Sequence, residues 1–125
     1  MSLNEYFKTV EGTGILATSD SEGNVDLAIY SKPYIIGENK IAFSMLERTS
    51  YANIQSNPKA AYMFMEEGSG YNGKRLYLKM AGEETDQKFI EEIKAQRPKK
   101  HVSKTDSVRH FVYFSIEKVR PVAGS

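Results

Sequence analysis

The alternation of apolar and polar residues is the clearest pattern in the chain, and it predicts β-strands. Val25, Leu27 and Ile29 occupy every second position of one segment, which is the period of a strand face. Turn-forming residues separate such segments, as in the run Asp20-Ser21-Glu22-Gly23. We predict strands at 13–19, 24–31, 60–65, 75–82 and 108–119 and a hairpin over 34–45, about six strands in all.

Apolar residues three and four positions apart predict short helices between the strands. Leu3, Tyr6, Phe7 and Val10 form one such stripe near the beginning of the chain. We expect helices at 2–11, at 48–56, and from a cap at Thr85 or Asp86 to a stop at Pro98.

Short turns between consecutive strands favour antiparallel pairing, because a parallel pair needs a long crossover connection. Strands of this kind around one core suggest a small β-barrel, which closes and thereby removes its exposed edges. The predicted fold class is therefore mainly β, a six-stranded antiparallel barrel with short helices. A chain of 125 residues has room for one such core, so we expect a single domain over 1–125.

Composition excludes several classes of function. The chain has no cysteine, which rules out disulfides, thiolate metal sites and a cysteine nucleophile. His101 and His110 lack a neighbouring ligand pattern, so we expect no metal site, and we expect His110 to be packed or interfacial. The net charge of +1 argues against polyanion binding over the whole surface. No apolar run approaches the roughly 20 residues of a membrane span, and we expect a cytoplasmic protein.

The glycine-rich run 68–74 looks like a nucleotide-binding motif, but we do not expect it to act as one. Residues 68–73 match a dinucleotide-binding fingerprint, and 68–74 match most of a phosphate loop. Both motifs need a helix after the glycines, because the helix N-terminus holds the phosphate. Here residues 75–82 alternate like a strand, so both motifs are rejected.

The segment Ser44–Ser50 is the best candidate anion site. A predicted strand passes here into a predicted helix, with Arg48, Thr49 and Ser50 at the helix start. A phosphate needs hydroxyls, free backbone N–H groups and a guanidinium of this kind. The alternative is that Thr49 or Ser50 only caps the helix. Two further polar segments stand at a strand end and in a loop, Tyr30-Ser31-Lys32 and Tyr71–Arg75.

Several segments, taken in their order along the chain, carry a family resemblance. They are Gly14-Ile15-Leu16-Ala17-Thr18 with 20–23, Asp26-Leu27-Ala28-Ile29-Tyr30, Ile41-Ala42-Phe43-Ser44-Met45, Asn53-Ile54-Gln55-Ser56-Asn57-Pro58-Lys59-Ala60-Ala61, 66–76 and 112–121. From about Gly12 to Val122 the chain resembles the pyridoxamine 5'-phosphate oxidase-like, FMN-binding split-barrel proteins, and 66–76 and 112–121 are similar to a small subgroup of that family.

The resemblance implies a homodimer of split barrels with FMN at the subunit interface. The strand over 28–32 would lie along the flavin, and 43–50 would meet its ribityl chain and phosphate. The loop 71–75 could reach the site, from the partner subunit. The resemblance assigns cofactor binding to Tyr30, Ser31, Lys32, Ser44, Met45, Arg48, Thr49, Ser50, Asn53, Tyr71, Lys74 and Arg75, and phosphate binding to Ser31, Lys32, Arg48, Thr49 and Ser50.

The chain departs from the family in two respects. Family members commonly have Lys followed by Thr at the helix start, whereas this chain has Thr49 and Ser50 there, with Arg48 one place earlier. Arg48 is the candidate to replace that lysine. No segment matches the C-terminal extension of the vitamin-B6 oxidases, which carries substrate-binding Arg and His, so we do not expect that activity.

We therefore expect an FMN-binding flavoprotein that passes hydride or electrons between a small-molecule donor and an unknown small substrate. No catalytic acid or base is assigned, because the flavin carries the chemistry. The alternatives are a flavin-binding or sensing module without turnover, and a split barrel that binds a deazaflavin or haem. A small barrel that binds single-stranded nucleic acid through its Lys and Arg loop, the basic run 97–104, and through exposed tyrosines is a further alternative. We expect neither a nucleic acid nor a membrane as the partner.

Overall fold

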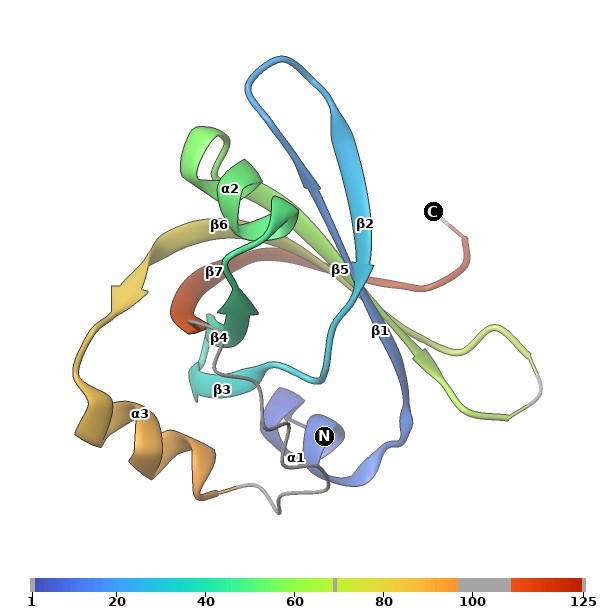
Figure 1. The fold of residues 1–125 in the computed structure, drawn as a ribbon. Coiled ribbons are helices and arrows are strands. Elements are labelled where there is room, and N and C mark those ends of the chain that lie inside the picture. Colours follow the sequence, from blue (N-terminus) through green and yellow to red (C-terminus); the bar gives the residue numbers. More distant parts are fainter. Residues whose placement is uncertain (1, 69, 97–108, 125) are drawn as a thin grey trace.

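The computed structural model describes residues 2–68, 70–96 and 109–124, most of which lie in strands (Figure 1). The helices are α1 (Leu3–Thr9), α2 (Thr49–Ser56) and α3 (Gln87–Lys94). The strands are β1 (Gly12–Ser19), β2 (Val25–Ile29), β3 (Tyr34–Gly37), β4 (Lys40–Leu46), β5 (Lys59–Glu66), β6 (Gly73–Glu84) and β7 (Arg109–Pro121). The predicted fold class, mainly β with short helices and antiparallel pairing, is confirmed.

The strands form one antiparallel sheet in the order β2-β1-β5-β6-β7-β4-β3. β2 and β3 follow each other in the chain, yet they lie at opposite edges of this sheet. In a flat sheet the two edges would be about 29 Å apart, six steps of roughly 4.8 Å. The linker 30–33 lets Ile29 and Tyr34 lie at most about 18 Å apart. The sheet must therefore curl until its edges approach each other (Figure 1).

The sequence prediction was wrong in two details of this sheet. The hairpin expected over 34–45 is present as the paired strands β3 and β4, but the expected total of about six strands was too low, because the described residues contain seven. The barrel is also not closed, because β2 and β3 do not pair. Pro33 lies between them and has no N–H group with which to continue a ladder of hydrogen bonds. The curled sheet therefore remains split between β2 and β3.

Alternate residues of the central strands fill the core. Leu16, Tyr62, Leu76 and Phe114 are fully buried. α1 covers this core with Tyr6 and Phe7, and the Phe7 ring packs edge-on against Phe64 at 5.3 Å between centroids. α2 packs on β1, β2 and β4, which places its beginning beside the split.

α3 lies on the side of the molecule away from β2 (Figure 1). The Asp86 carboxylate caps it, accepting hydrogen bonds from the N–H groups of Lys88 and Phe89 at 3.0 and 3.4 Å. The predicted stop at Pro98, the basic run 97–104 and His101 lie outside the described residues. None of the helices in the described ranges is long and apolar enough to cross a membrane.

Candidate functional site

A pocket of about 400 Å³ lies along the split in the barrel. The end of β2 and the residues that follow it form one wall, while β4, the beginning of α2 and the first residue of β7 form the other. A volume of this size is typical of sites for small-molecule ligands. The curl of the sheet is what brings these two walls together.

Six of the residues predicted to bind a cofactor line this pocket. Tyr30, Ser31, Ser44, Arg48, Thr49 and Ser50 contribute to it. They come from three segments that the sheet order places on opposite sides of the split. The two polar segments that the sequence analysis singled out on separate grounds, 30–32 and 44–50, therefore meet at one site.

Three other predicted residues lie close in sequence to the pocket but outside its lining. Met45 is fully buried in the core. The Asn53 side-chain amide is also buried and donates a hydrogen bond to the Thr18 hydroxyl at 3.0 Å. The Lys32 ammonium lies 3.8 Å from the Glu11 carboxylate. The side chains of Met45 and Asn53 therefore lie in the interior of the barrel and not in the pocket lining.

The remaining three predicted residues belong to the β5–β6 hairpin and lie away from the pocket of the same subunit. Tyr71 is 76% exposed. The Lys74 ammonium lies 4.8 Å from the centroid of the Tyr6 ring. The Arg75 guanidinium donates hydrogen bonds to carbonyl oxygens near the C-terminus, those of Pro121 and Gly124. That this hairpin reaches a partner subunit's pocket stays a prediction.

The sequence analysis missed Arg109, which is the most consequential addition to the pocket. Arg109 is the first residue of β7 and pairs with Leu46 in the register of β4 and β7. No local pattern marks it, because its place in the site depends on pairing with a strand far away in the sequence. Leu46, Ala28, Ile29 and Asp26 are the other lining residues that were not predicted.

The beginning of α2 gives the pocket an electropositive end. Its first turn contains no acidic residue, and the Arg48 side chain makes no capping hydrogen bond there. Thr49 and Ser50 place two hydroxyls beside the unpaired N–H groups of that turn. Arg48 and Arg109 add two guanidinium groups, against the single carboxylate of Asp26. This end of the pocket suits an anion.

Tyr30 provides a neutral aromatic wall next to the arginines. Its ring packs edge-on against Phe43 at 5.7 Å between centroids. Burial raises the pKa of the Tyr30 hydroxyl, although a hydrogen bond with Ser50 and the charge of Arg109 act in the opposite direction. The hydroxyl therefore stays protonated at neutral pH and available as a donor.

A single buried hydroxyl holds the other wall of the pocket in place. The Tyr62 hydroxyl lies 3.2 Å from the carbonyl oxygens of both Tyr30 and Ser31, and it donates its proton to this pair. The Tyr30 N–H group in turn donates to the carbonyl of Gly14 at 3.0 Å. These contacts tie the linker after β2 to the core strands β1 and β5.

Solved structures match the chain, whereas no protein-family model and no curated protein does. An FMN-binding protein from Syntrophomonas wolfei subsp. wolfei has a TM-score of 0.81 and 21% sequence identity, covering 98% of this chain and 84% of that one. An F420 reductase has a TM-score of 0.69 and 16% identity over 93% of this chain and 94% of its own. A proposed pyridoxamine 5'-phosphate oxidase from Lactobacillus delbrueckii has a TM-score of 0.69 and 18% identity, with coverages of 96% and 92%.

The matching proteins share a fold but differ in the molecule that their descriptions name. A haem storage protein from Vibrio cholerae also matches, with a TM-score of 0.62 and 15% identity over 97% of this chain and 95% of that one. Low identity together with near-complete coverage shows a common fold rather than a common ligand. The chain has the split-barrel fold of the FMN-binding, pyridoxamine 5'-phosphate oxidase-like proteins, as its sequence predicts.

Proposed function

We propose that this protein is an FMN-binding flavoprotein and that it works as an oxidoreductase on a small substrate. The observation that carries the proposal is the pocket in the split, which combines two arginines and a helix N-terminus with apolar and aromatic side chains. The FMN-binding structural neighbour supports the same ligand class. When bound, FMN would accept and return hydride or electrons.

The electropositive end of the pocket fits the FMN phosphate. Arg48 and Arg109 would pair with its oxygens, and the Thr49 and Ser50 hydroxyls with the N–H groups of the first turn of α2 would complete the shell. Arginine suits this task because its planar guanidinium can bind two phosphate oxygens at once.

The apolar and aromatic residues of the lining fit the flavin ring system. Ala28, Ile29 and Leu46 supply apolar contacts, and Tyr30 supplies an aromatic edge and a hydroxyl donor. In this arrangement the chain binds and orients the cofactor and limits its contact with water. A donor near the ring would also stabilise its reduced, anionic form.

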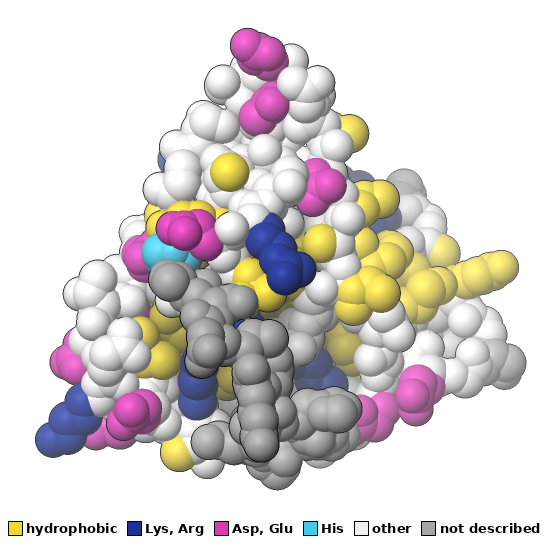
Figure 2. Space-filling model, viewed as in Figure 1, with side chains coloured by type: hydrophobic (Ala, Val, Ile, Leu, Met, Phe, Trp, Pro, Cys, Tyr) yellow, Lys and Arg dark blue, Asp and Glu magenta, His cyan; other side chains and the backbone are white. Residues whose placement is uncertain are grey.

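The apolar face of β2 supports a homodimer with the cofactor at its interface. Val25, Leu27 and Ile29 are 82%, 72% and 79% exposed, and they lie on one face of an edge strand. Figure 2 shows hydrophobic side chains gathered on the right of the molecule, where β2 and the C-terminal segment lie in Figure 1. An exposed apolar row on an edge strand favours association with another protein chain, because association buries it. Because Ile29 also lines the pocket, a second copy seated on β2 would border the bound ligand.

Leu27→Glu should convert the dimer to a monomer, because it puts a charge at the centre of the apolar row. We expect sedimentation velocity to show a fall from twice 14.1 kDa to 14.1 kDa, together with weaker retention of FMN. Phe89→Glu is the matched control, since Phe89 is also exposed but lies on α3, away from β2. If the Leu27→Glu protein keeps the dimer mass, β2 is not part of the interface.

The visible absorption spectrum tests the cofactor. The purified protein is measured as isolated, and again after FMN has been added and the sample desalted. A retained flavin spectrum, with free FMN released on denaturation, supports the proposal. A colourless protein that fails to retain FMN contradicts it. Reduction by a nicotinamide donor, followed by reoxidation by an acceptor, then separates an oxidoreductase from a module that only binds flavin.

The same spectrum separates FMN from the deazaflavin and haem alternatives. His110 is the one histidine among the described residues, and both of its ring nitrogens lie within hydrogen-bonding distance of carboxylates. Both nitrogens of His110 are therefore engaged by carboxylates in this arrangement. A nucleic-acid ligand would instead show binding that weakens steeply with salt.

A further inference from the structure

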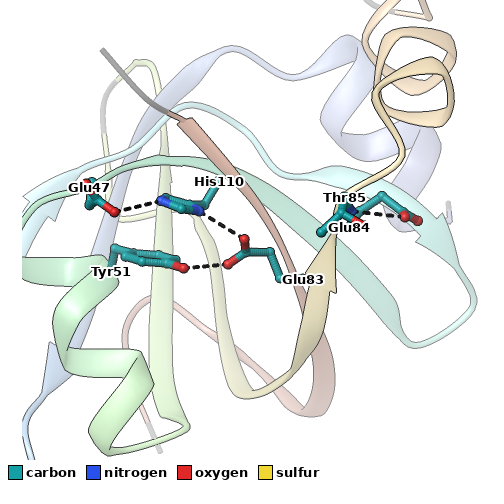
Figure 3. Close-up of polar contacts among 6 residues, drawn as sticks. All are labelled: Glu47, Tyr51, Glu83, Glu84, Thr85 and His110. Atoms are coloured by element: carbon teal, nitrogen blue, oxygen red, sulfur yellow. Dashed lines mark hydrogen bonds and ion pairs between the residues drawn. The ribbon is translucent and has the colours of Figure 1, made fainter.

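A second polar cluster lies directly behind the proposed phosphate site and has no part in the binding described so far. It consists of Glu47, Tyr51, Glu83 and His110 (Figure 3). Glu47 precedes Arg48 in the chain, and His110 follows Arg109. Each of the two pocket arginines therefore has a member of this cluster as its covalent neighbour.

His110 lies at the centre of the cluster. Its Nδ1 lies 2.9 Å from Oε2 of Glu83 on β6, and its Nε2 lies 3.2 Å from Oε1 of Glu47 after β4. Its ring stacks on Tyr51 of α2, with 3.9 Å between centroids and 10° between planes. The Tyr51 hydroxyl donates to Oε1 of Glu83 at 2.6 Å. One imidazole thus connects β7, β6, α2 and the turn that carries Arg48.

Only the protonated imidazole satisfies both of its contacts. A neutral imidazole has one N–H donor and one lone pair, whereas the cation donates from both nitrogens. The hydrogen bond to Glu83 raises the pKa of His110, and the nearby Glu47 acts in the same direction although burial opposes it.

Glu83 and Tyr51 keep their protonation states near neutral pH. Burial raises the pKa of Glu83, but the hydrogen bonds from Tyr51 and His110 outweigh it and leave that pKa below its usual value. The hydrogen bond to Glu83 raises the pKa of Tyr51 to about 12. Of Glu83, Tyr51 and His110, His110 is therefore the group that loses a proton near neutral pH.

We propose that protonated His110 is a positioning residue for the phosphate site, so that FMN affinity depends on its charge. The inference rests on the proposed function. Protonated His110 holds Glu47 and thereby the turn that presents Arg48, and it fixes the start of β7, which presents Arg109. It also adds a positive charge behind both arginines.

Loss of that proton has two consequences for the pocket. The contact with Glu47 is the longer of the two, and the Glu47 side chain is 64% exposed, so this contact breaks first. The turn before α2 then loses its side-chain contact with β7, and the pairing of Leu46 with Arg109 still connects the two. The carboxylates of Glu47 and Glu83 are also left without the cation between them, which makes the surroundings of Arg48 and Arg109 less positive. Both changes weaken the binding of a phosphate.

The test compares FMN with riboflavin, which lacks the phosphate, across a pH series. For the unchanged protein we expect FMN affinity to fall about two- to fivefold as the pH rises above 6.5 through the pKa of His110, the effect of one screened charge. Riboflavin affinity should stay flat. The second ionisation of a phosphate, with a pKa of about 6, acts in the opposite direction and is common to every variant.

His110→Gln is the matched variant, because its amide is neutral at every pH and can still bind a carboxylate. It should remove the fall in FMN affinity above pH 6.5 and leave riboflavin binding unchanged. Glu47→Gln changes an exposed residue and keeps the imidazole. It should move the fall to lower pH, because one of the two carboxylates that raise the pKa of His110 is gone.

The outcomes are distinguishable. If FMN affinity follows the same pH curve in the unchanged protein and in His110→Gln, the role of His110 is overturned while flavin binding stands. If neither FMN nor riboflavin binds at any pH, the proposed function itself fails. A readout without cofactor is the free energy of unfolding. The pKa of His110 is higher in the folded state than in the unfolded state. The contribution of protonated His110 to the free energy of unfolding is therefore complete below pH 6.5 and is lost as the pH rises through the folded pKa. His110→Gln should not show this loss.

Discussion

Replacing Arg48 and Arg109 together by alanine should weaken FMN binding about a hundredfold or more and leave riboflavin binding almost unchanged. Each guanidinium would make a charged hydrogen bond to the phosphate, and such bonds contribute roughly 1.5 to 3 kcal/mol each. Two of them correspond to at least about two orders of magnitude in the dissociation constant. Quenching of flavin fluorescence on binding measures both ligands with the same protein samples.

Arg120→Ala is the matched control for the arginine pair. Arg120 belongs to the same strand as Arg109 but lies near its other end, opposite Arg75 on β6. We expect it to leave the affinity for FMN unchanged. Equal losses of FMN and riboflavin in the double variant would show that the arginines support the fold of the pocket rather than the phosphate. Unchanged FMN binding would show that the phosphate lies elsewhere. If the double variant loses FMN selectively, the two single variants measure whether Arg48 or the unpredicted Arg109 contributes more.

Gly14→Ala should destabilise the protein by about 2 to 4 kcal/mol and weaken the binding of both flavins. A Cβ atom at Gly14 would overlap the Tyr62 hydroxyl and approach the Tyr30 carbonyl oxygen to 2.5 Å. Overpacking of this kind costs roughly 1 to 3 kcal/mol. Displacement of the hydroxyl adds the loss of the one hydrogen bond that it shares between residues 30 and 31, about 0.5 to 1.5 kcal/mol in all. Urea denaturation measures the first effect, and flavin titration measures the second.

Gly37→Ala is the control, because nothing lies within 4 Å of a Cβ built there and its backbone is not left-handed. Its stability should stay within about 0.5 kcal/mol of the unchanged protein. Tyr62→Phe removes the atom that the new Cβ overlaps, so Gly14→Ala should cost less in that background than alone. A Gly14→Ala protein of ordinary stability that binds both flavins normally would show that the linker after β2 does not depend on this close approach.

Local patterns accounted for most of the elements and for half of the candidate site. The alternation at 75–82 and the stripe through Tyr6 and Phe7 each depend on side chains that bury one face, so the residues themselves indicate strand or helix. The local sequence likewise indicated the structure of the predicted anion segment 44–50. A strand end, a turn and a helix start are local events, and Arg48, Thr49 and Ser50 lie in the pocket where they were expected.

The errors arose where distant segments meet. The strand over 24–31 was predicted to continue past Ile29, but the linker leaves the sheet at Tyr30 because the Tyr62 hydroxyl holds its carbonyls. Met45 was assigned to cofactor binding with its neighbours, although strand alternation turns its side chain into the core. Arg109 was not assigned at all, since only pairing with β4 places it beside Arg48.

The sequence by itself determined the mainly β class, the antiparallel pairing and the polar character of the two segments that meet in the pocket. These follow from side-chain periodicity and turn chemistry, which act between residues close in the chain. Only the tertiary structure decided that the sheet has seven strands and stays open, and that Arg109 and His110 stand beside the phosphate end of the pocket. The physical reason is that a short linker joins strands at opposite edges of the sheet. It forces the sheet to curl, and that curl depends on the whole order of strands rather than on any one of them.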